Sequence, residues 1–250
     1  HVGEDGGGHW EYGEEEIIPI IDVPPGIYAD TQTLRVKVRL PEGSDPDTQI
    51  RYTLDGTIVD GDSPLYGGAI TISETRSLKA RAFAADGRRL GREARARYQF
   101  RTLQSVPAKS PSDTRPGLHY AYHHTDRGDL ADRRPESEGV AKTPDLSMRK
   151  SYDHAVVFTG YVSVDKSGTW TFYLTSDNNS ELYIGDRLVA DNTIRGPRQI
   201  VIKTHAGQAI LERGRHPIRL VARDCRESLE IDWNGPGQDR QPIPAGALSH

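Results

Sequence analysis

The feature that most limits the fold of this chain is a strict alternation of apolar and polar residues within short segments. In the segment TLRVKVRL, residues 33–40, the apolar positions are Leu34, Val36, Val38 and Leu40, with Arg or Lys between them. Because successive side chains of a β-strand point to opposite faces, this spacing predicts strands with one buried face. No segment repeats apolar residues at the spacing of a helix, so we predict an all-β chain without a helix longer than about two turns.

Turn and linker signals divide these segments into two groups. Asp55-Gly56 and Asp86-Gly87 are dipeptides typical of tight turns between antiparallel strands. After residue 102, Pro, Ser and charged residues follow one another without periodicity, as in a linker. We therefore predict two antiparallel β-sandwich domains. The expected division is an acidic N-terminal junction at 1–22, a fibronectin-like domain at 23–102, a linker at 103–115 and a second β-sandwich at 116–250.

The second domain is predicted from its own alternating segments. Its expected strands are VVFTGYVSV, TWTFYLTS, SELYIG, RLVADN, RQIVIKT, HPIRLVARD and LEIDWNG. Residues that share one face of their strand predict the core. This core consists of Trp170, Phe172, Leu174, Ile218, Leu220 and Ala222.

Composition excludes several classes of partner and activity. The 32 basic and 36 acidic residues nearly balance, so the chain as a whole does not require nucleic acid as a partner. No apolar run reaches the roughly 18 residues of a membrane-spanning helix, which predicts no membrane partner. The single cysteine, Cys225, cannot form an internal disulfide. It also lacks the following x-Pro-x-Arg of a sulfatase nucleophile, and other hydrolase and nucleotide-binding motifs are absent, so we predict no catalytic residues.

The segment SDNNSELYIGDRLVADN, residues 176–192, combines a polar corner with a predicted hairpin. The corner carries side-chain oxygens of the kind that ligate Ca²⁺ or hydrogen-bond sugar hydroxyls. We predict a carbohydrate-binding rim formed by Asp177, Asn178, Asn179, Asp191, Asn192 and Arg195. The alternative is a hairpin that turns at Gly185-Asp186 and whose polar loop binds no ligand.

Outward strand positions of the first domain carry a second candidate site. It consists of the basic residues Arg35, Lys37, Arg39, Lys79, Arg81, Arg95 and Arg97. Alternating sheets are polar outside and use Lys and Arg to protect their edges, so these charges have a purely structural explanation. The functional interpretation is a cationic face that binds sulfated or acidic polysaccharide, or the acidic segment 1–22. Nucleic acid is not expected, because aromatic residues are not interleaved with the charges.

The first domain resembles the fibronectin-like C-terminal domain of bacterial chitobiases, hexosaminidases and sulfatases. The signature of that domain is a tyrosine-threonine-leucine-aspartate-glycine hairpin, then serine-x-leucine-tyrosine, then an alternating lysine-alanine strand. The matching segments are Tyr52–Gly56, Ser63–Tyr66 and Leu78–Phe83. The usual serine-x-proline-threonine after the hairpin is replaced by residues 57–60, TIVD, so we expect a different loop there.

The second domain resembles, along nearly its whole length, the module first recognised in anthrax protective antigen. The resemblance rests on FTGY at 158–161, the Ser-Asp corner at 176–177 and WNGPG at 233–237, in the order of that module. In the yeast flocculation lectins that share the module, two adjacent aspartates joined by a cis peptide bind Ca²⁺ at the position of Asp177-Asn178. Asn178 keeps a carbonyl ligand but removes one charge, so the resemblance implies a sugar-contacting corner with a weakened calcium site formed by Asp177 and Asn178.

Together the two resemblances imply a non-catalytic, carbohydrate-binding C-terminal region of a secreted or cell-surface bacterial polysaccharide-degrading enzyme. That enzyme would be a glycoside hydrolase or sulfatase, with its catalytic domain upstream in the same chain. Calcium is the one cofactor that the resemblance suggests, and polysaccharide is the expected partner. Two alternatives remain open: a structural spacer without ligand, and a cell-surface module that adheres to glycans.

Overall fold

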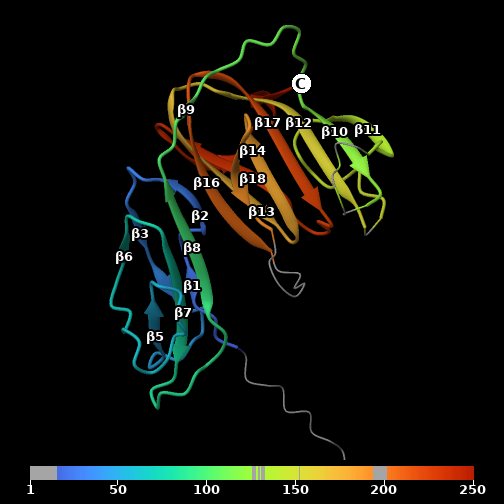
Figure 1. Ribbon diagram of the computed structural model, residues 1–250. Coiled ribbons are helices and arrows are strands. Elements are labelled where there is room, and N and C mark those ends of the chain that lie inside the picture. The colour runs from blue at the N-terminus through green and yellow to red at the C-terminus, as the bar shows by residue number, and fades with distance from the viewer. Residues whose placement is uncertain (1–15, 126–127, 129, 131–132, 152, 194–201) are drawn as a thin grey trace, which may run out of the picture. The chain divides into compact units, whose positions relative to one another are not determined.

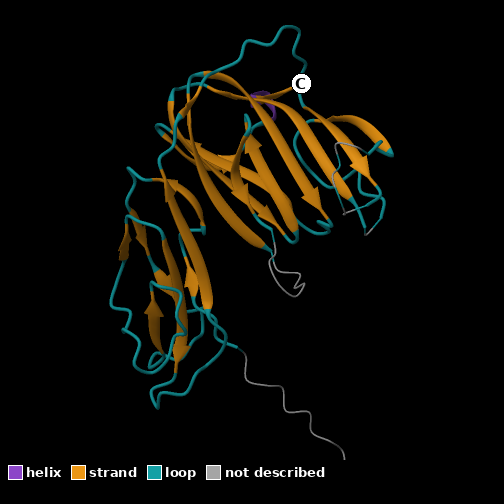
Figure 2. Ribbon diagram, in the orientation of Figure 1, coloured by secondary structure: helices purple, strands orange, loops and turns teal. Residues whose placement is uncertain are grey.

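The computed structural model describes residues 16–125, 128, 130, 133–151, 153–193 and 202–250 (Figure 1). Almost all regular structure in these residues is β-strand, and the one helical element is the three-residue 3-10 helix η1 (Ala245–Ala247) (Figure 2). The predicted all-β class is therefore confirmed. No helix among the described residues has the length and apolar character needed to span a membrane.

Backbone contacts divide the chain into two compact units that do not follow the order of the sequence. Among the described residues, unit 1 comprises 16–22, Lys37–Ala69 and Ser77–Arg95, and unit 2 comprises Val23–Val36, Ile70–Arg76 and those from Ala96 to His250. The predicted linker, 103–115, contains a short strand, β9 (Ser105–Val106), which pairs in parallel with β16 (Lys203–Leu211) in unit 2. The predicted domain boundaries stay a prediction.

Unit 1 is built from short antiparallel pairs. Its strands are β1 (Ile20–Ile21), β4 (Val38–Arg39), β5 (Gln49–Thr53), β7 (Arg76–Phe83) from Ser77 onward, and the first two residues of β8 (Ala94–Arg101). Strand β1 pairs with β4, and β5 pairs with β7. The predicted continuous strand 33–40 is interrupted at Lys37, whose backbone N–H donates to Oδ1 of Asp22 at 2.7 Å instead of to a neighbouring strand.

The two predicted turns of the first domain have different outcomes. At Asp86-Gly87 the chain turns tightly: Gly87 has a φ of 84°, and the N–H of Ala84 donates to the carbonyl of Arg88 at 2.8 Å. The two-residue hairpin predicted at Asp55-Gly56 is wrong. Asp55 instead accepts a hydrogen bond from the N–H of Thr57, and β5 is next bonded to residues 64–66 after a longer loop. At this point the hydrogen bond from the N–H of Thr57 to the side chain of Asp55 takes the place of the backbone hydrogen bonds of a tight hairpin.

Unit 2 contains the remaining strands, in three sheets. Strands β3 (Leu34–Val36) and β6 (Ile70–Ile72) form an antiparallel pair. One larger sheet has the order β11 (Ser137–Ala141), β10 (Leu118–His123), β12 (Ala155–Val164), β17 (Gly214–Arg223), β14 (Asn179–Ile184), β15 (Arg187–Asp191), with β20 (Leu248–Ser249) also on β12. The other has the order β19 (Gln238–Pro242), β18 (Leu229–Gly235), β13 (Gly168–Ser176), β16, β2 (Gly26–Ala29), β8, with β9 also on β16.

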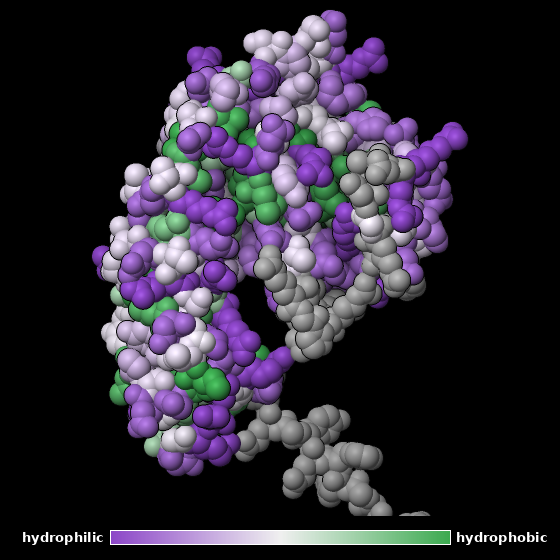
Figure 3. Space-filling model, in the orientation of Figure 1, coloured by the Kyte–Doolittle hydropathy of each residue, from purple (hydrophilic) through white to green (hydrophobic). Residues whose placement is uncertain are grey.

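The two larger sheets of unit 2 face each other across one hydrophobic core, with β12, β14 and β17 in one layer and β13, β16 and β18 in the other (Figure 1). The predicted core is confirmed, since its six residues are each at most 3% exposed. They are Trp170, Phe172, Leu174, Ile218, Leu220 and Ala222. Hydrophilic residues cover most of the visible surface, with smaller apolar areas between them (Figure 3).

Candidate functional site

Two connections between the layers of unit 2 lie side by side at the polar corner. One links the end of β13 to β14 through Asp177 and Asn178, and the other links the end of β17 to β18 through residues 224–228. Ser176 is the partner of Leu229 in one sheet, and Asn179 is the partner of Arg223 in the other. Both chain crossings therefore meet at the same end of the sandwich.

The carboxylate of Asp177 binds the second of these connections. Its side chain is buried, with 1% of the residue exposed, and both oxygens accept the backbone N–H of Arg226 at 3.0 Å. Oδ2 also accepts the N–H of Glu227 at 3.2 Å, and Oδ1 accepts that of Ser228 at 3.3 Å. Asp177 thus holds the loop 226–228 in place through three backbone donors that have no partner in a strand ladder.

Asn178 joins the same two connections through its amide. Nδ2 donates to the backbone carbonyl of Asp224 at 3.2 Å, and Oδ1 accepts the N–H of Asn179 at 2.9 Å. Asp224 has a φ of 54°, a left-handed conformation that aspartate tolerates better than most residues. Every peptide bond of the described residues is trans, including the bond between Asp177 and Asn178.

Asn192 lies at the centre of a buried hydrogen-bond network beneath the corner. Its Nδ2 donates to the carbonyl of Lys203 at 2.9 Å and to Oγ and the carbonyl of Ser176 at 2.6 and 3.3 Å. Because Nδ2 faces three oxygens, Oδ1 is the acceptor that faces Nδ1 of His205 at 2.8 Å, so Nδ1 carries the proton. Burial lowers the pKa of His205, which favours the neutral ring.

The predicted carbohydrate-binding residues therefore occupy different environments. Asp177, Asn178 and Asn192 are buried and bonded within the protein, whereas Asn179 and Asp191 are half-buried at the surface of the corner. Arg195 lies outside the described residues. Their contact with carbohydrate stays a prediction.

Sequence reasoning missed two residues that reach the surface at this corner. Glu227 is exposed and Arg226 is half-buried, in the loop that Asp177 holds. Nothing in the local sequence signals their position, because the loop is anchored to a residue about fifty positions earlier in the chain.

Calcium binding at Asp177 and Asn178 also stays a prediction. Ca²⁺ takes about six to eight oxygen ligands. The oxygens of Asp177 face three N–H groups here, whose partial positive charge opposes a cation in the same place. The described residues contain no group of three or more acidic, histidine or cysteine side chains that could hold a metal ion. In this conformation the two residues do not fit a calcium site, because the N–H groups of the loop 226–228 lie where the ion would bind the carboxylate of Asp177.

Only part of the basic set is brought together. The side chains of Lys79, Arg81 and Arg95 lie 3.8, 3.6 and 3.2 Å from the carboxylate of Glu93, whose side chain is 2% exposed. Burial acts to raise the pKa of Glu93, but the N–H of Val59 and these cations outweigh it and lower that pKa. The single carboxylate of Glu93 therefore balances one of these three positive charges within unit 1.

The other basic residues of the set lie elsewhere. Arg35 is on β3, Lys37 lies between β3 and β4, Arg39 is on β4 and Arg97 is on β8, and all four are exposed. Binding of anionic polysaccharide by the whole set stays a prediction. For the proposed contact with the acidic segment 1–22, the described residues include an ion pair of Glu16 with Arg92 at 2.7 Å, and Arg92 lies outside the basic set.

Solved structures with a similar fold include an anti-sigma factor domain-containing protein from Clostridium clariflavum. It is 17% identical, with 80% of this chain and 79% of that chain covered and a TM-score of 0.43. A PA14 sugar-binding domain from an RTX adhesin is 17% identical, with coverages of 54% and 98% and a TM-score of 0.43. The Epithelial Adhesin 9 A domain from Candida glabrata, in complex with Galβ1-3GlcNAc, is 11% identical, with coverages of 59% and 94% and a TM-score of 0.46.

The family comparisons match two separate parts of the sequence. No curated protein matches the chain. Neither of the matching family models describes a catalytic domain. Residues 23–90 match the chitobiase/beta-hexosaminidase C-terminal domain, and residues 133–246, which include both connections of the polar corner, match the PA14 domain.

Proposed function

We propose that the β-sandwich of unit 2 is a non-catalytic carbohydrate-binding module whose ligand contacts the polar corner. The observation that carries this proposal is the PA14 match over 133–246, because the matched segment includes both connections that meet there. The module that these residues resemble uses the same corner to bind sugars in yeast flocculation lectins.

In this proposal the buried and the exposed residues of the corner have different tasks. Asp177 and Asn192 position the loops, because their side chains are buried and bond to other parts of the protein. Sugar hydroxyls need both donors and acceptors, and the surface residues Asn179, Asp191 and Glu227 supply side chains of this kind. The contact with the glycan therefore falls to these three residues in the proposal.

The chitobiase/beta-hexosaminidase match supports an accessory role. In the proposal, the module serves a secreted or cell-surface bacterial enzyme that degrades polysaccharide, a glycoside hydrolase or a sulfatase. Its catalytic domain lies upstream in the same chain. Binding would keep that domain close to an insoluble or polymeric substrate and so raise its effective concentration there.

A glycan array with neutral and sulfated polysaccharides tests the proposal, followed by titration of the best ligand against two matched variants. Glu227→Gln removes a charge from an exposed side chain at the corner. Asp186→Asn removes one at the exposed turn that follows the other end of β14. We expect Glu227→Gln to weaken binding at least fivefold and Asp186→Asn to leave it unchanged.

The outcomes separate the alternatives. If the array retains no glycan, the chain is a spacer and the proposal fails. Retention of host-type oligosaccharides without any polysaccharide indicates an adhesion module instead. Equal binding by the Glu227 and Asp186 variants would place the glycan away from the corner.

A further inference from the structure

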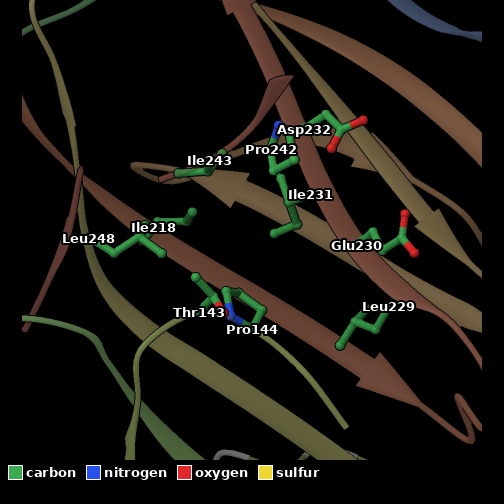
Figure 4. A pocket seen from close by; sticks show the side chains of 10 residues that line it. All are labelled: Thr143, Pro144, Ile218, Leu229, Glu230, Ile231, Asp232, Pro242, Ile243 and Leu248. Atoms are coloured by element: carbon green, nitrogen blue, oxygen red, sulfur yellow. The ribbon is translucent and has the colours of Figure 1, made fainter. Parts of the chain in front are cut away.

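Unit 2 also contains a cavity of about 200 Å³ at the edge between its two larger sheets. Ile231 on β18 and Ile243 after β19 form one side, and Ile218 on β17 and Leu248 on β20 form the other. Figure 4 shows these four side chains around a common space, with Thr143 at one margin. The cavity is thus a gap in the core, closed on one side by the segment after β11.

Aliphatic side chains form the larger part of the cavity wall, although Glu230 and Asp232 of β18 also lie along it. Glu230 and Asp232 alternate with Leu229 and Ile231 along the strand, and their carboxylates point away from the space (Figure 4). Asp232 is also paired with Arg240, whose Nε lies 2.8 Å from Oδ2. The strand period therefore directs the aliphatic groups inward and the charges outward.

The cavity is partly open to solvent. The aliphatic side chains that line it are at most 8% exposed. They are Ile218, Leu229, Ile231, Ile243 and Leu248. A molecule that enters therefore contacts these side chains and keeps part of its contact with solvent.

An empty space of this kind is unfavourable, because protein interiors are close-packed and the lining atoms lack partners on one side. An apolar cavity of about 150 Å³ in another protein stays dry and takes up benzene or xenon. The present cavity exceeds that volume, and aliphatic side chains form the larger part of its wall.

We infer that this cavity is a binding site for small, uncharged, apolar molecules of the size of a substituted benzene. Such a ligand supplies the dispersion contacts that the aliphatic side chains lack, and because it is uncharged, its entry requires no desolvation of a charge. None of the lining residues belongs to the polar corner, so the site is separate from the proposed glycan contacts.

Three probes of nearly equal size test the chemical class: toluene, benzoate and benzylammonium. Titration of the full chain is followed by the methyl resonances of the lining Ile and Leu residues. We expect saturable shifts with toluene, and binding at least tenfold weaker for both ions, since the carboxylates of Glu230 and Asp232 point away from the space and the aliphatic side chains around it offer a charge no partner. No saturable shift with toluene overturns the inference, and so does equal or tighter binding of either ion.

A pair of variants tests the location. Thr143→Trp introduces a large side chain at the margin of the cavity, and Ser147→Trp introduces the same side chain at an exposed position of the same loop. We expect the first to lose toluene affinity at least tenfold and the second to keep it. Equal affinity in the two variants contradicts the assignment. If Thr143→Trp does not fold, the comparison of the three probes on the unmodified chain still decides the question.

Discussion

Replacing Asp177 by Ala tests whether this carboxylate supports the fold or contacts the ligand. The substitution removes the acceptor for the N–H groups of Arg226, Glu227 and Ser228. We expect a clear loss of stability in unit 2, because the loop between β17 and β18 loses its anchor. A residue that only lined a sugar rim would be replaced at little cost.

The magnitude follows from the three donors. A hydrogen bond to a charged group contributes about 1.5–3 kcal/mol, and an unsatisfied buried donor costs about 1–3 kcal/mol. The N–H of Ser228 is buried, whereas those of Arg226 and Glu227 are partly accessible to water and recover part of the loss. The carboxylate also regains its hydration in the unfolded chain. We therefore expect the free energy of unfolding to fall by about 2–4 kcal/mol, or about 5–15 °C in Tm.

Tryptophan fluorescence during urea unfolding measures this loss. Trp170 and Trp233 are buried in unit 2 with ring centroids 4.6 Å apart, so their emission reports on this unit. A Trp10→Phe background removes the third tryptophan. Asp186→Ala, in an exposed turn, is the control. The reasoning is refuted if Asp177→Ala costs less than about 0.5 kcal/mol, or no more than the control.

Three further predictions concern pH and calcium. The pKa of Glu93 is lowered in the folded protein, so its stabilising effect is present above about pH 4.5 and is lost as the pH falls through the folded value. In urea unfolding of unit 1, Glu93→Gln should therefore lose less unfolding free energy on acidification than the unmodified chain does. An equal loss in the two proteins would contradict this. The pKa of His205 is also lowered, so unit 2 loses stability as the pH falls below the ordinary value of 6.5. His205→Gln, which keeps a donor for Asn192, should therefore reduce the destabilisation of unit 2 between pH 7.5 and 5.5. The same pH dependence in the variant and the unmodified chain would contradict this. Asn178→Asp removes the donor to the carbonyl of Asp224, so without calcium it should lower the free energy of unfolding by about 1–3 kcal/mol. If added Ca²⁺ does not raise the Tm of this variant again, the corner is not a calcium site.

The regular strands could be predicted because a single property, the two-residue period, determines them. Trp170, Phe172 and Leu174 alternate in the sequence and lie fully buried on β13. Strand β16 shows the limit of this signal. Residues 198–201 of the predicted segment RQIVIKT lie outside the described residues, and its last two residues, Lys203 and Thr204, begin the strand. The strand continues through Gly207, where an added Cβ would lie 1.7 Å from the carbonyl oxygen of Val189. Close approach of another strand, rather than alternation, fixes this part of the chain.

The candidate site was less predictable, for a reason that its hydrogen bonds make clear. Composition marks Asp177 and Asn192 as polar residues at a corner, and this part of the prediction needs only local sequence. Whether such a side chain faces solvent depends on which backbone groups come near it. The donors that bind Asp177 come from residues 226–228, and the acceptors around Asn192 include the carbonyl of Lys203. Those partners are set by the packing of the two sheets.

A β-sandwich creates this need for polar side chains wherever the chain passes from one sheet to the other. The backbone groups of such a crossing leave the strand ladder and must find other partners. Two crossings that meet at one corner can satisfy each other, and Asp177 does this for the loop 226–228. With the support buried beneath the surface, residues such as Glu227 can change without loss of the loop conformation. Ligand specificity should therefore depend on the exposed loop residues, while Asp177 keeps the loop in position.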